Sequence, residues 1–268
     1  MMEGKMKKVL VTGSNGWIGK CCVKNLREKG YQVHPILGNL LEKPKFLPVA
    51  THLLHLAWIT TPGEYWESPE NVQWFESSLR LFQEFKEDGG QRIVVAGTCA
   101  EITGGSLYGK SKNALRKVLE SYSDVTGVSS AWGRIFYLYG PHEKTERLVS
   151  SSIISLLQKR EVFINHPSQM LDILHVYDVA SALVSILDSD VKGTIEIGTG
   201  NPDTTIRIVQ IISEILDCPE LVKANNLPSY DRIACNPHRL MKEAGWTPKY
   251  NLHTGLEHTI EWWKNNTE

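Results

Sequence analysis

The sequence has few of the features that mark a membrane protein or a nucleic-acid-binding protein. No apolar run approaches the roughly 20 residues that a membrane-spanning helix requires. Lysine and arginine (29) nearly balance aspartate and glutamate (30), so neither nucleic acid nor an anionic membrane surface is expected as a partner. No signal-peptide core precedes the first apolar segment, which favours a cytoplasmic protein that binds a small molecule.

Cysteine is too scarce to form a disulfide framework. The five cysteines are odd in number and lack the paired spacing of zinc sites: Cys21, Cys22, Cys99, Cys218 and Cys235. We therefore expect no metal site, and we interpret most of these thiols as small buried hydrophobes. With 268 residues, of which 41% are hydrophobic, the chain can bury one large core, or one core with a smaller lobe attached.

Short apolar runs alternate with helical patterns along most of the chain. Strands are expected at residues 8–11, 32–37, 52–57, 92–96, 129–135 and 194–197. Residues 73–85 and 107–119 carry apolar side chains at helical spacing and predict two of the helices between them. Because continuous apolar strands that alternate with helices form sheets covered on both faces, the fold class is α/β, a doubly wound parallel sheet of the Rossmann type.

A glycine-rich turn follows the first expected strand. Residues 12–19 read TGSNGWIG and lead into a segment with a helical pattern. A strand that ends in such a turn directs the unpaired N–H groups and the positive dipole end of the next helix at a pyrophosphate, and the glycines remove the side chains that would block its approach. The turn therefore predicts a dinucleotide pocket.

The regular alternation loosens after Tyr139, and this predicts a smaller C-terminal substrate lobe. We assign residues 1–140 and 171–200 to the dinucleotide-binding domain. Residues 141–170 and 201–268 are assigned to the substrate-binding lobe.

Tyr108 and Lys112 lie four residues apart in the segment YGKSK, hence on one face of a helix, where the ammonium can lower the pKa of the phenol. Tyr–Lys pairs at this spacing also arise by chance, so only their position in the fold can indicate a catalytic role. They follow the expected strand at residues 92–96, at the carboxyl end of the sheet, where ligands of doubly wound folds bind. We expect them to face the same crevice as the glycine turn.

The chain resembles the extended short-chain dehydrogenase/reductase family, in particular its nucleotide-sugar epimerases and reductases. Residues 12–19 match the TGxxGxxG turn of that family, residues 55–57 (HLA) its fourth-strand signature and residues 108–112 its YxxxK helix. Three later segments are similar to family motifs as well: RIFYLYGP at 134–141, DILHVYDVA at 172–180 and GWTP at 245–248.

This resemblance implies roles for individual residues. Tyr108 is expected as the general acid or base at a sugar hydroxyl or keto group, and Lys112 as the residue that holds the nicotinamide ribose and favours the tyrosinate. The third catalytic position of the family falls at Cys99 by direct register, but a thiol is a poor hydrogen-bond donor, and we favour Thr98 one residue earlier. The expected cofactor-binding residues are Gly13, Asn15, Gly16, Trp17, Ile18, Gly19, Asn39, Leu40, Leu56, Ala57, Trp58, Tyr108, Lys112 and Ile135.

The substrate side departs from the family pattern at two positions. Tyr137 stands where the family usually has Asn, and Leu171 where an Arg often grips the nucleotide phosphate. Recognition of the diphosphate is therefore assigned to the nearest cations, Arg147 and Arg232, with Lys144 as a further candidate. The expected substrate-binding residues are Trp58, Tyr137, Arg147 and Arg232.

Two segments near the expected site are short. Only six residues separate Glu101 from Tyr108, where relatives usually carry a longer substrate loop, which leaves a more open site, a site closed by a partner subunit, or a protein that binds cofactor without turnover. No Asp or Glu stands at the end of the second expected strand, where an acid would bind the ribose of NAD and repel the phosphate of NADP. The expected cofactor is NAD(P), with a slight preference for NADP.

We interpret the chain as an NAD(P)-dependent enzyme that reduces a nucleotide-linked 4-keto-6-deoxy sugar. The alternative is a nucleotide-sugar C4 epimerase, and an alternative of another class is a non-catalytic, regulatory relative that still binds the cofactor. A 4,6-dehydratase is disfavoured because the acidic pair that normally follows the active-site Thr is replaced by Cys99 and Ala100, which leaves only Glu101. The resemblance also implies a homodimer.

Overall fold

The computed structural model describes residues 7–42, 47–225, 227–228 and 233–266. These residues form two compact units. The first unit contains residues 1–135, 180–196 and 238–246, and the second contains residues 136–179, 197–237 and 247–268.

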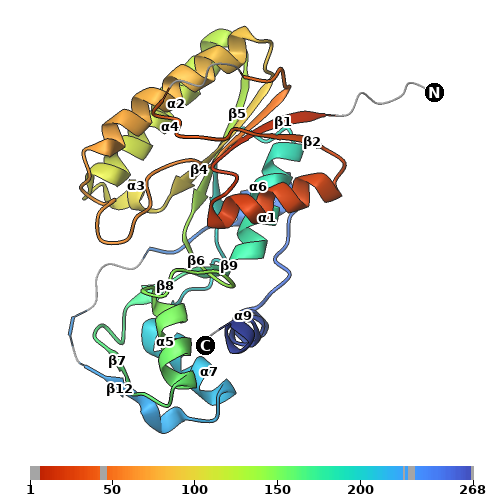
Figure 1. Cartoon of the computed structure of the whole chain (residues 1–268). Helices are drawn as coiled ribbons and strands as arrows, with labels where there is room; N and C mark the ends of the chain where they lie inside the picture. Colours follow the sequence, from red (N-terminus) through yellow and green to blue (C-terminus); the bar gives the residue numbers. More distant parts are fainter. Residues whose placement is uncertain (1–6, 43–46, 226, 229–232, 267–268) are drawn as a thin grey trace. The chain divides into compact units, whose positions relative to one another are not determined.

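The first unit is built on a six-stranded sheet with the strand order β10-β5-β4-β3-β1-β2 (Figure 1). Its strands are β1 (Lys8–Thr12), β2 (Gln32–Pro35), β3 (His52–His55), β4 (Arg92–Thr98), β5 (Ser129–Ile135) and β10 (Gly193–Ile197). Every neighbouring pair from β5 to β2 is parallel. The fold class predicted from the sequence, a doubly wound parallel sheet, is confirmed.

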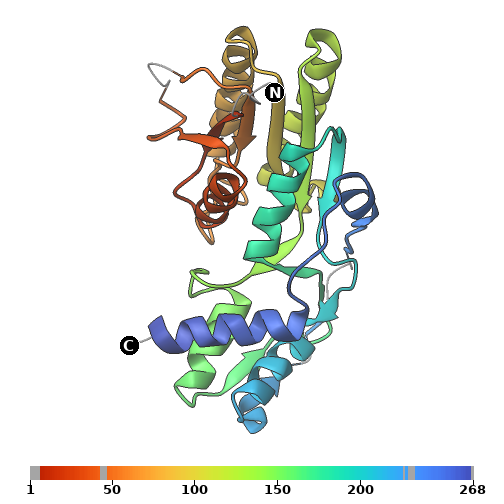
Figure 2. The same ribbon diagram turned by 90° about the vertical axis from the view of Figure 1, so that its right-hand side faces the viewer.

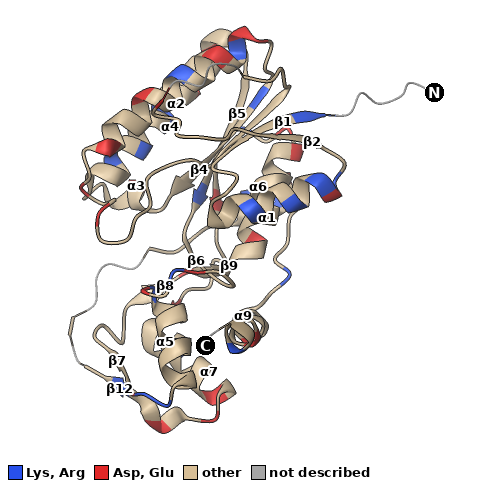
Figure 3. Ribbon diagram, viewed as in Figure 1, with Lys and Arg blue, Asp and Glu red and all other residues tan. Residues whose placement is uncertain are grey.

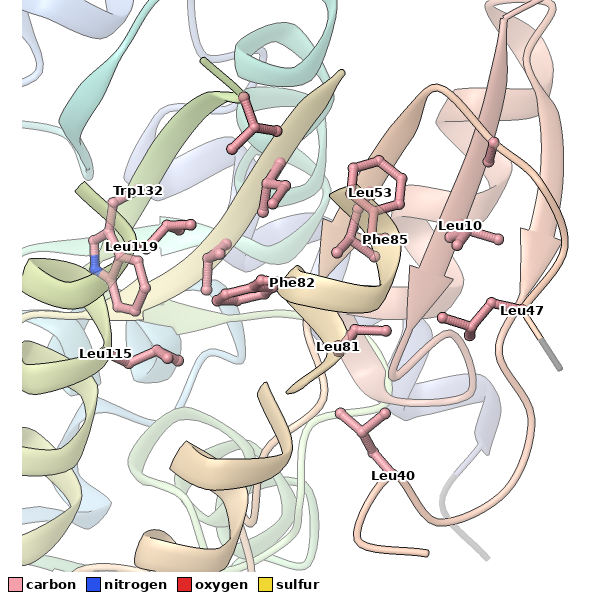
Figure 4. Close-up of a cluster of buried hydrophobic side chains, with 14 of the residues drawn as sticks. Leu10, Leu40, Leu47, Leu53, Leu81, Phe82, Phe85, Leu115, Leu119 and Trp132 are labelled. Atoms are coloured by element: carbon pink, nitrogen blue, oxygen red, sulfur yellow. The ribbon is translucent and has the colours of Figure 1, made fainter. Parts of the chain in front are cut away.

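Helices cover both faces of this sheet, as the continuous apolar strands require. Their bounds are α1 (Trp17–Glu28), α2 (Glu70–Glu87), α3 (Ala100–Thr103), α4 (Leu107–Thr126), α6 (Val176–Asp188) and α8 (His238–Glu243). Leu10 of β1 and Leu53 of β3 pack under Phe82 and Phe85 of α2, and Trp132 of β5 packs with residues of α4 (Figure 4). The helices α1 and α6 lie on the opposite face (Figure 1).

Two of the expected strands end earlier than their apolar runs do. The second was expected to reach residue 37, but β2 ends at Pro35. The third was expected to reach residue 57, but β3 ends at His55 because the Thr12 hydroxyl accepts hydrogen bonds from the backbone N–H groups of Leu56 (3.0 Å) and Ala57 (3.1 Å). These N–H groups are thereby turned toward the end of β1.

In the part of the second unit that the structure describes, there are three two-stranded ladders and three helices. The ladders pair β6 (Tyr137–Tyr139) with β9 (Ile173–His175), β7 (Val162–Ile164) with β12 (Val222–Ala224), and β8 (Met170–Leu171) with β11 (Asp203–Thr204). The helices α5 (Leu148–Leu157), α7 (Thr205–Ile215) and α9 (Leu252–Asn266) pack against one another around Ile153, Ile208 and Ile260 (Figure 2). A short 3₁₀ turn, η1 (Pro219–Leu221), precedes β12.

The division into units differs from the expected one at residues 136–140, 171–179, 197–200 and 238–246. Residues 136–140 and 171–179 were expected in the dinucleotide-binding domain but belong to the second unit, because β6 and β9 pair with each other. Residues 238–246 were expected in the lobe but belong to the first unit. There Trp246 Nε1 donates to Ser181 Oγ (2.8 Å), and the Arg239 guanidinium donates to the carbonyl of Thr194 (2.9 Å).

The charged side chains of both signs are interspersed along α1, α2 and α4 (Figure 3). Within the described ranges, no helix is long and apolar enough to cross a bilayer. The part of the chain that the structure describes also contains no group of three or more His, Cys, Asp or Glu side chains placed to hold a metal ion.

Candidate functional site

The turn between β1 and α1 brings the backbone close to neighbouring segments. Gly13 has φ = +66°, and a Cβ atom there would lie 2.8 Å from the backbone nitrogen of Ala57. A Cβ atom on Gly19 would overlap the carbonyl oxygen of Gly13. Only glycine fits these two positions, so the sequence TGSNGWIG is a requirement of the turn geometry.

A pocket of about 210 Å³ opens in front of this turn. It is lined by Thr12, Gly13, Ser14, Asn15, Gly16, Ile36, Leu37, Gly38, Leu40, Ala57, Trp58 and Trp74. The first turn of α1 lies at the glycine end of the pocket, so its N–H groups and positive dipole end favour a bound anion. The lining contains no carboxylate, which suits the pyrophosphate of a dinucleotide.

A buried chain of hydrogen bonds supports the floor of the pocket. Thr12 Oγ1 lies 2.9 Å from His55 Nδ1, and His55 Nε2 lies 2.9 Å from Ser78 Oγ on α2. Burial lowers the pKa of His55 to about 3, and the nearby Lys112 charge lowers it further. His55 is therefore neutral at physiological pH, and it ties β3 to α2.

Tyr108 and Lys112 lie on the first two turns of α4. This helix is capped by Ser106, whose hydroxyl accepts from Gly109 N (3.1 Å), and a Cβ atom on Gly109 would overlap the carbonyl oxygen of Ala100. Cap and glycine together set the start of α4 against β4 and α3. The close packing of α4 on α3 thus explains why glycine follows Tyr108 in the motif.

Lys112 is 2% exposed and is held by two neighbours. Its ammonium donates to the carbonyl of Ala96 (2.9 Å) and lies 4.0 Å from the centroid of the Trp58 ring, a cation–π distance. Burial lowers the pKa of Lys112 to about 7, and the Glu101 charge acts against this shift. Because Trp58 also lines the pocket, Lys112 stands directly behind the pocket wall.

Thr98, not Cys99, shares a hydrogen bond with the Tyr108 side chain. Burial raises the pKa of the Tyr108 phenol, and the Thr98 hydrogen bond opposes this rise. Cys99 is buried, its backbone N–H donates to the carbonyl of Ile135 (2.8 Å), and burial raises the pKa of its thiol to about 11. Of the two residues, Thr98 therefore has the geometry that the resemblance implies.

Glu101 is buried among donors that fully occupy its carboxylate. Oε1 accepts from the backbone N–H of Thr98 (2.8 Å) and from Trp132 Nε1 (2.8 Å), and Oε2 accepts from Arg134 Nε (3.3 Å). The Thr98 hydroxyl in turn accepts from Ala100 N (3.3 Å). Glu101 thereby orients Thr98, and its own side chain has no exposed surface.

The structure brings only part of the expected cofactor set into the pocket wall. Gly13, Asn15, Gly16, Leu40, Ala57 and Trp58 line the pocket. Trp17, Ile18, Gly19, Asn39, Leu56, Tyr108, Lys112 and Ile135 do not. Asn39 is exposed, and its Oδ1 accepts from the backbone N–H of Leu41 (3.1 Å).

The expected substrate residues are divided. Tyr137, 39% exposed, and Arg147, at the N-cap of α5, belong to the second unit, whereas Trp58 belongs to the first. Arg232 lies outside the described residues.

Sequence analysis did not identify four residues near Tyr108 and the pocket. Trp74 lines the pocket, Tyr65 and Trp66 pack against Tyr108, and Asn71 holds their segment in place. The sequence does show a cluster of aromatic side chains in and near the long connection between β3 and α2, and this cluster could have indicated a binding site.

Comparisons with known proteins identify the family of the chain. Residues 9–198 match the model of the NAD dependent epimerase/dehydratase family. The chain is 27% identical over 212 residues to a dTDP-D-glucose 4,6-dehydratase of Mus musculus, an alignment that covers 67% of this chain and 58% of the relative. The chain thus spans little more than half the length of that curated relative.

Two solved structures share the fold across almost the whole chain. A UDP-N-acetylglucosamine 4-epimerase from Methanobrevibacter ruminantium, in complex with UDP-N-acetylmuramic acid, superposes with a TM-score of 0.86 at 20% identity and covers 98% of this chain and 100% of its own. RMD from Pseudomonas aeruginosa, complexed with NADPH, superposes with a TM-score of 0.84 at 17% identity and covers 98% and 100%.

Proposed function

Because the chain belongs to the NAD dependent epimerase/dehydratase family, within the extended short-chain dehydrogenases/reductases, we propose that it is an NAD(P)-dependent reductase of a nucleotide-linked 4-keto-6-deoxy sugar. One observation carries the proposal. Trp58 forms part of the pocket wall and also carries the Lys112 ammonium on its ring, so the glycine turn and the Tyr108–Lys112 pair serve one site.

The residues of the first unit fit a nicotinamide dinucleotide. The glycines allow the turn to approach the end of β3 and the start of α1 closely, and the α1 N–H groups supply donors for a pyrophosphate. When bound, the cofactor supplies or accepts a hydride at the sugar carbon. Tyr108 donates or accepts the proton at the oxygen of that carbon, Thr98 hydrogen-bonds the same oxygen, and Lys112 holds the ribose and modulates the charge of the phenol.

The protonation state of Tyr108 favours reduction over epimerisation. Because burial raises the pKa of its phenol, Tyr108 starts as a proton donor at neutral pH. A keto group whose carbon receives a hydride needs such a proton donor at its oxygen, whereas the first step of an epimerase needs a base at the sugar hydroxyl. The fold similarity to a 4-epimerase keeps C4 epimerisation as the second candidate.

The site lacks the acid that dehydration requires. Glu101, the one acidic side chain after Thr98, is fully buried and bound to Thr98, Trp132 and Arg134. It therefore cannot reach a substrate, although a curated relative of the chain is a 4,6-dehydratase. Cys99 packs as a buried thiol in this proposal and does not replace the acid.

We assign a preference for NADP to the apolar end of β2. The pocket wall there consists of Ile36, Leu37 and Gly38, and none of the described lining residues would repel a 2′-phosphate.

We assign binding of the substrate diphosphate to Arg147 and Arg232, as expected from the sequence, and we assign a contact with the sugar to Tyr137. The exposed Val72 of α2, with Val118 and Val125 of α4, supports a homodimer through these helices.

The proposal is tested with the purified protein and two measurements. Mass spectrometry under non-denaturing conditions identifies any retained dinucleotide: tightly held NAD favours the epimerase, and an empty site that takes up NADPH favours the reductase. Oxidation of NADPH by a dTDP- or UDP-linked 4-keto-6-deoxy hexose is expected. Interconversion of UDP-sugars without net cofactor consumption would instead support the epimerase. A protein that binds cofactor and turns over neither class of sugar would be the non-catalytic relative.

A further inference from the structure

The connection between β3 and α2, which contains none of the family motifs, lies beside Tyr108. Residues 59–69 connect β3 to α2 and are tied to the start of α4 by two hydrogen bonds. Tyr108 N donates to the carbonyl of Trp66 (3.0 Å), and Leu107 N donates to Glu67 Oε2 (3.3 Å). The segment therefore lies beside Tyr108, next to the short connection at residues 102–107.

Two aromatic side chains of this segment form a stack against Tyr108. The rings of Tyr65 and Trp66 are stacked, with centroids 4.6 Å apart and an interplanar angle of 29°. Both are perpendicular to the Tyr108 ring, at centroid distances of 5.0 Å for Tyr65 and 5.8 Å for Trp66. Tyr65 is 8% exposed, but Trp66 is 44% exposed. An indole with this much exposed surface thus stands beside the proposed proton donor.

Asn71 fixes the turn that carries Trp66. It is fully buried, and its amide nitrogen donates to the carbonyls of Tyr65 (2.7 Å) and Ser68 (2.8 Å), which bracket Trp66 in the chain. Its Oδ1 accepts from Trp58 Nε1 (2.8 Å). One amide therefore links the turn that carries Trp66 to the tryptophan that holds Lys112.

We infer that Trp66 is a binding platform for the hexose ring of the substrate, and that it takes the place of the substrate loop, which is shortened to residues 102–107 in this chain. The inference rests on the proposed function. A hexose presents C–H groups on its ring faces and hydroxyls around its edge, so the ring face packs on an indole while the edge is left to hydrogen-bond Thr98 and Tyr108. A 6-deoxy sugar, with a methyl group in place of the primary alcohol, adds apolar area to this contact.

The test separates the sugar from the nucleotide. Dissociation constants are measured by calorimetry for UDP-glucose, UDP, dTDP-glucose and dTDP, each with NADPH-saturated protein. Trp66→Ala is expected to weaken binding of the nucleotide sugars about tenfold, as loss of some 50 Å² of apolar contact would. Binding of UDP, dTDP and NADPH is expected to stay within about twofold. Trp66→Phe, which keeps an aromatic face, is expected to recover most of the loss.

Met241→Ala is the matched control, because Met241 is an apolar side chain of α8 with a similar exposure of 42%. It should leave all constants unchanged. If Trp66→Ala binds the nucleotide sugars as the parent protein does, or loses UDP and dTDP to the same extent, the platform is refuted while the proposed function stands. If the parent protein binds NADPH but none of the four nucleotide probes, the substrate class is wrong and the platform falls with it.

Discussion

The Lys112 ammonium lies 4.0 Å from the centroid of the Trp58 ring, and Trp58 is part of the wall of the glycine-turn pocket. Lys112 is therefore buried directly behind the Trp58 ring, and the opposite side of this wall is the pocket. The contact joins two motifs that are almost a hundred residues apart in the sequence. It makes the stability of the free protein depend on the protonation of Lys112.

Replacement of Lys112 by Met should remove this pH dependence. Burial lowers the pKa of Lys112 from 10.5 to about 7, so between these values the unfolded chain binds a proton that the folded chain does not. The free energy of unfolding of the parent protein should therefore rise, relative to that of Lys112→Met, by about 1.4 kcal/mol per pH unit from pH 7 toward pH 10. Urea denaturation at several pH values measures the difference. Parallel curves for the two proteins would mean that Lys112 stays charged in the fold.

Tyr108→Phe should abolish turnover and spare the pocket. Loss of the phenolic hydroxyl removes the proposed proton donor, and turnover should fall about 10²- to 10⁴-fold. The ring contacts with Tyr65 and Trp66 remain, so the dissociation constant for NADPH should change less than about threefold. Steady-state kinetics and calorimetry give both numbers. Unchanged turnover would remove Tyr108 from the chemistry and favour a protein that only binds the cofactor.

Glu101→Gln should damage both stability and the position of Thr98. The amide has one acceptor oxygen where the carboxylate has two, so its NH2 group faces either the Thr98 N and Trp132 Nε1 donors or the Arg134 guanidinium. The free energy of unfolding should therefore fall by about 2–4 kcal/mol. Displacement of Thr98 should lower kcat/KM about 10- to 100-fold. Glu120→Gln is the control: Glu120 pairs with Arg116, its side chain is 37% exposed, and its loss should cost less than about 1 kcal/mol. A large loss of activity at unchanged stability would instead indicate that Glu101 reacts with substrate.

Leu37→Asp should turn the cofactor preference toward NAD. Leu37 is 71% exposed and lines the pocket just beyond β2, where an acid would bind the ribose hydroxyls and repel a 2′-phosphate. The dissociation constant for NADPH should rise about tenfold or more, while that for NADH stays equal or falls. Leu37→Asn, similar in size but uncharged, separates charge from packing. Equal weakening of both cofactors by Leu37→Asp would place the adenosine ribose elsewhere.

The parts of the site that the sequence predicted are those set by local geometry. The glycine turn, the apolar strands and the one-turn spacing of Tyr108 and Lys112 depend on neighbours along the chain. Each was found where it was expected, except that β2 and β3 end two residues early. The choice of Thr98 over Cys99 rested on hydrogen-bond chemistry alone. The structure adds its hydrogen bond to Tyr108.

The missed features depend on contacts between distant segments. Glu101 was counted as the remnant of an acidic pair, because Trp132 and Arg134, which bind it, lie on another strand. Asn71 has no signature in the sequence, since its three partners are two backbone carbonyls and one indole of a non-periodic connection. The early end of β3 likewise follows from a single hydroxyl, that of Thr12 on β1.

The most direct test of the shared site is a crystal structure of the protein with NADPH. The account predicts the pyrophosphate at the turn of Gly13 and Gly16, and the nicotinamide ring next to Tyr108, with its reactive carbon within about 4 Å of the space where a substrate carbon bonded to the phenol-bound oxygen would lie. A dinucleotide bound away from the glycine turn, or bound there with its nicotinamide directed away from Tyr108, would contradict it.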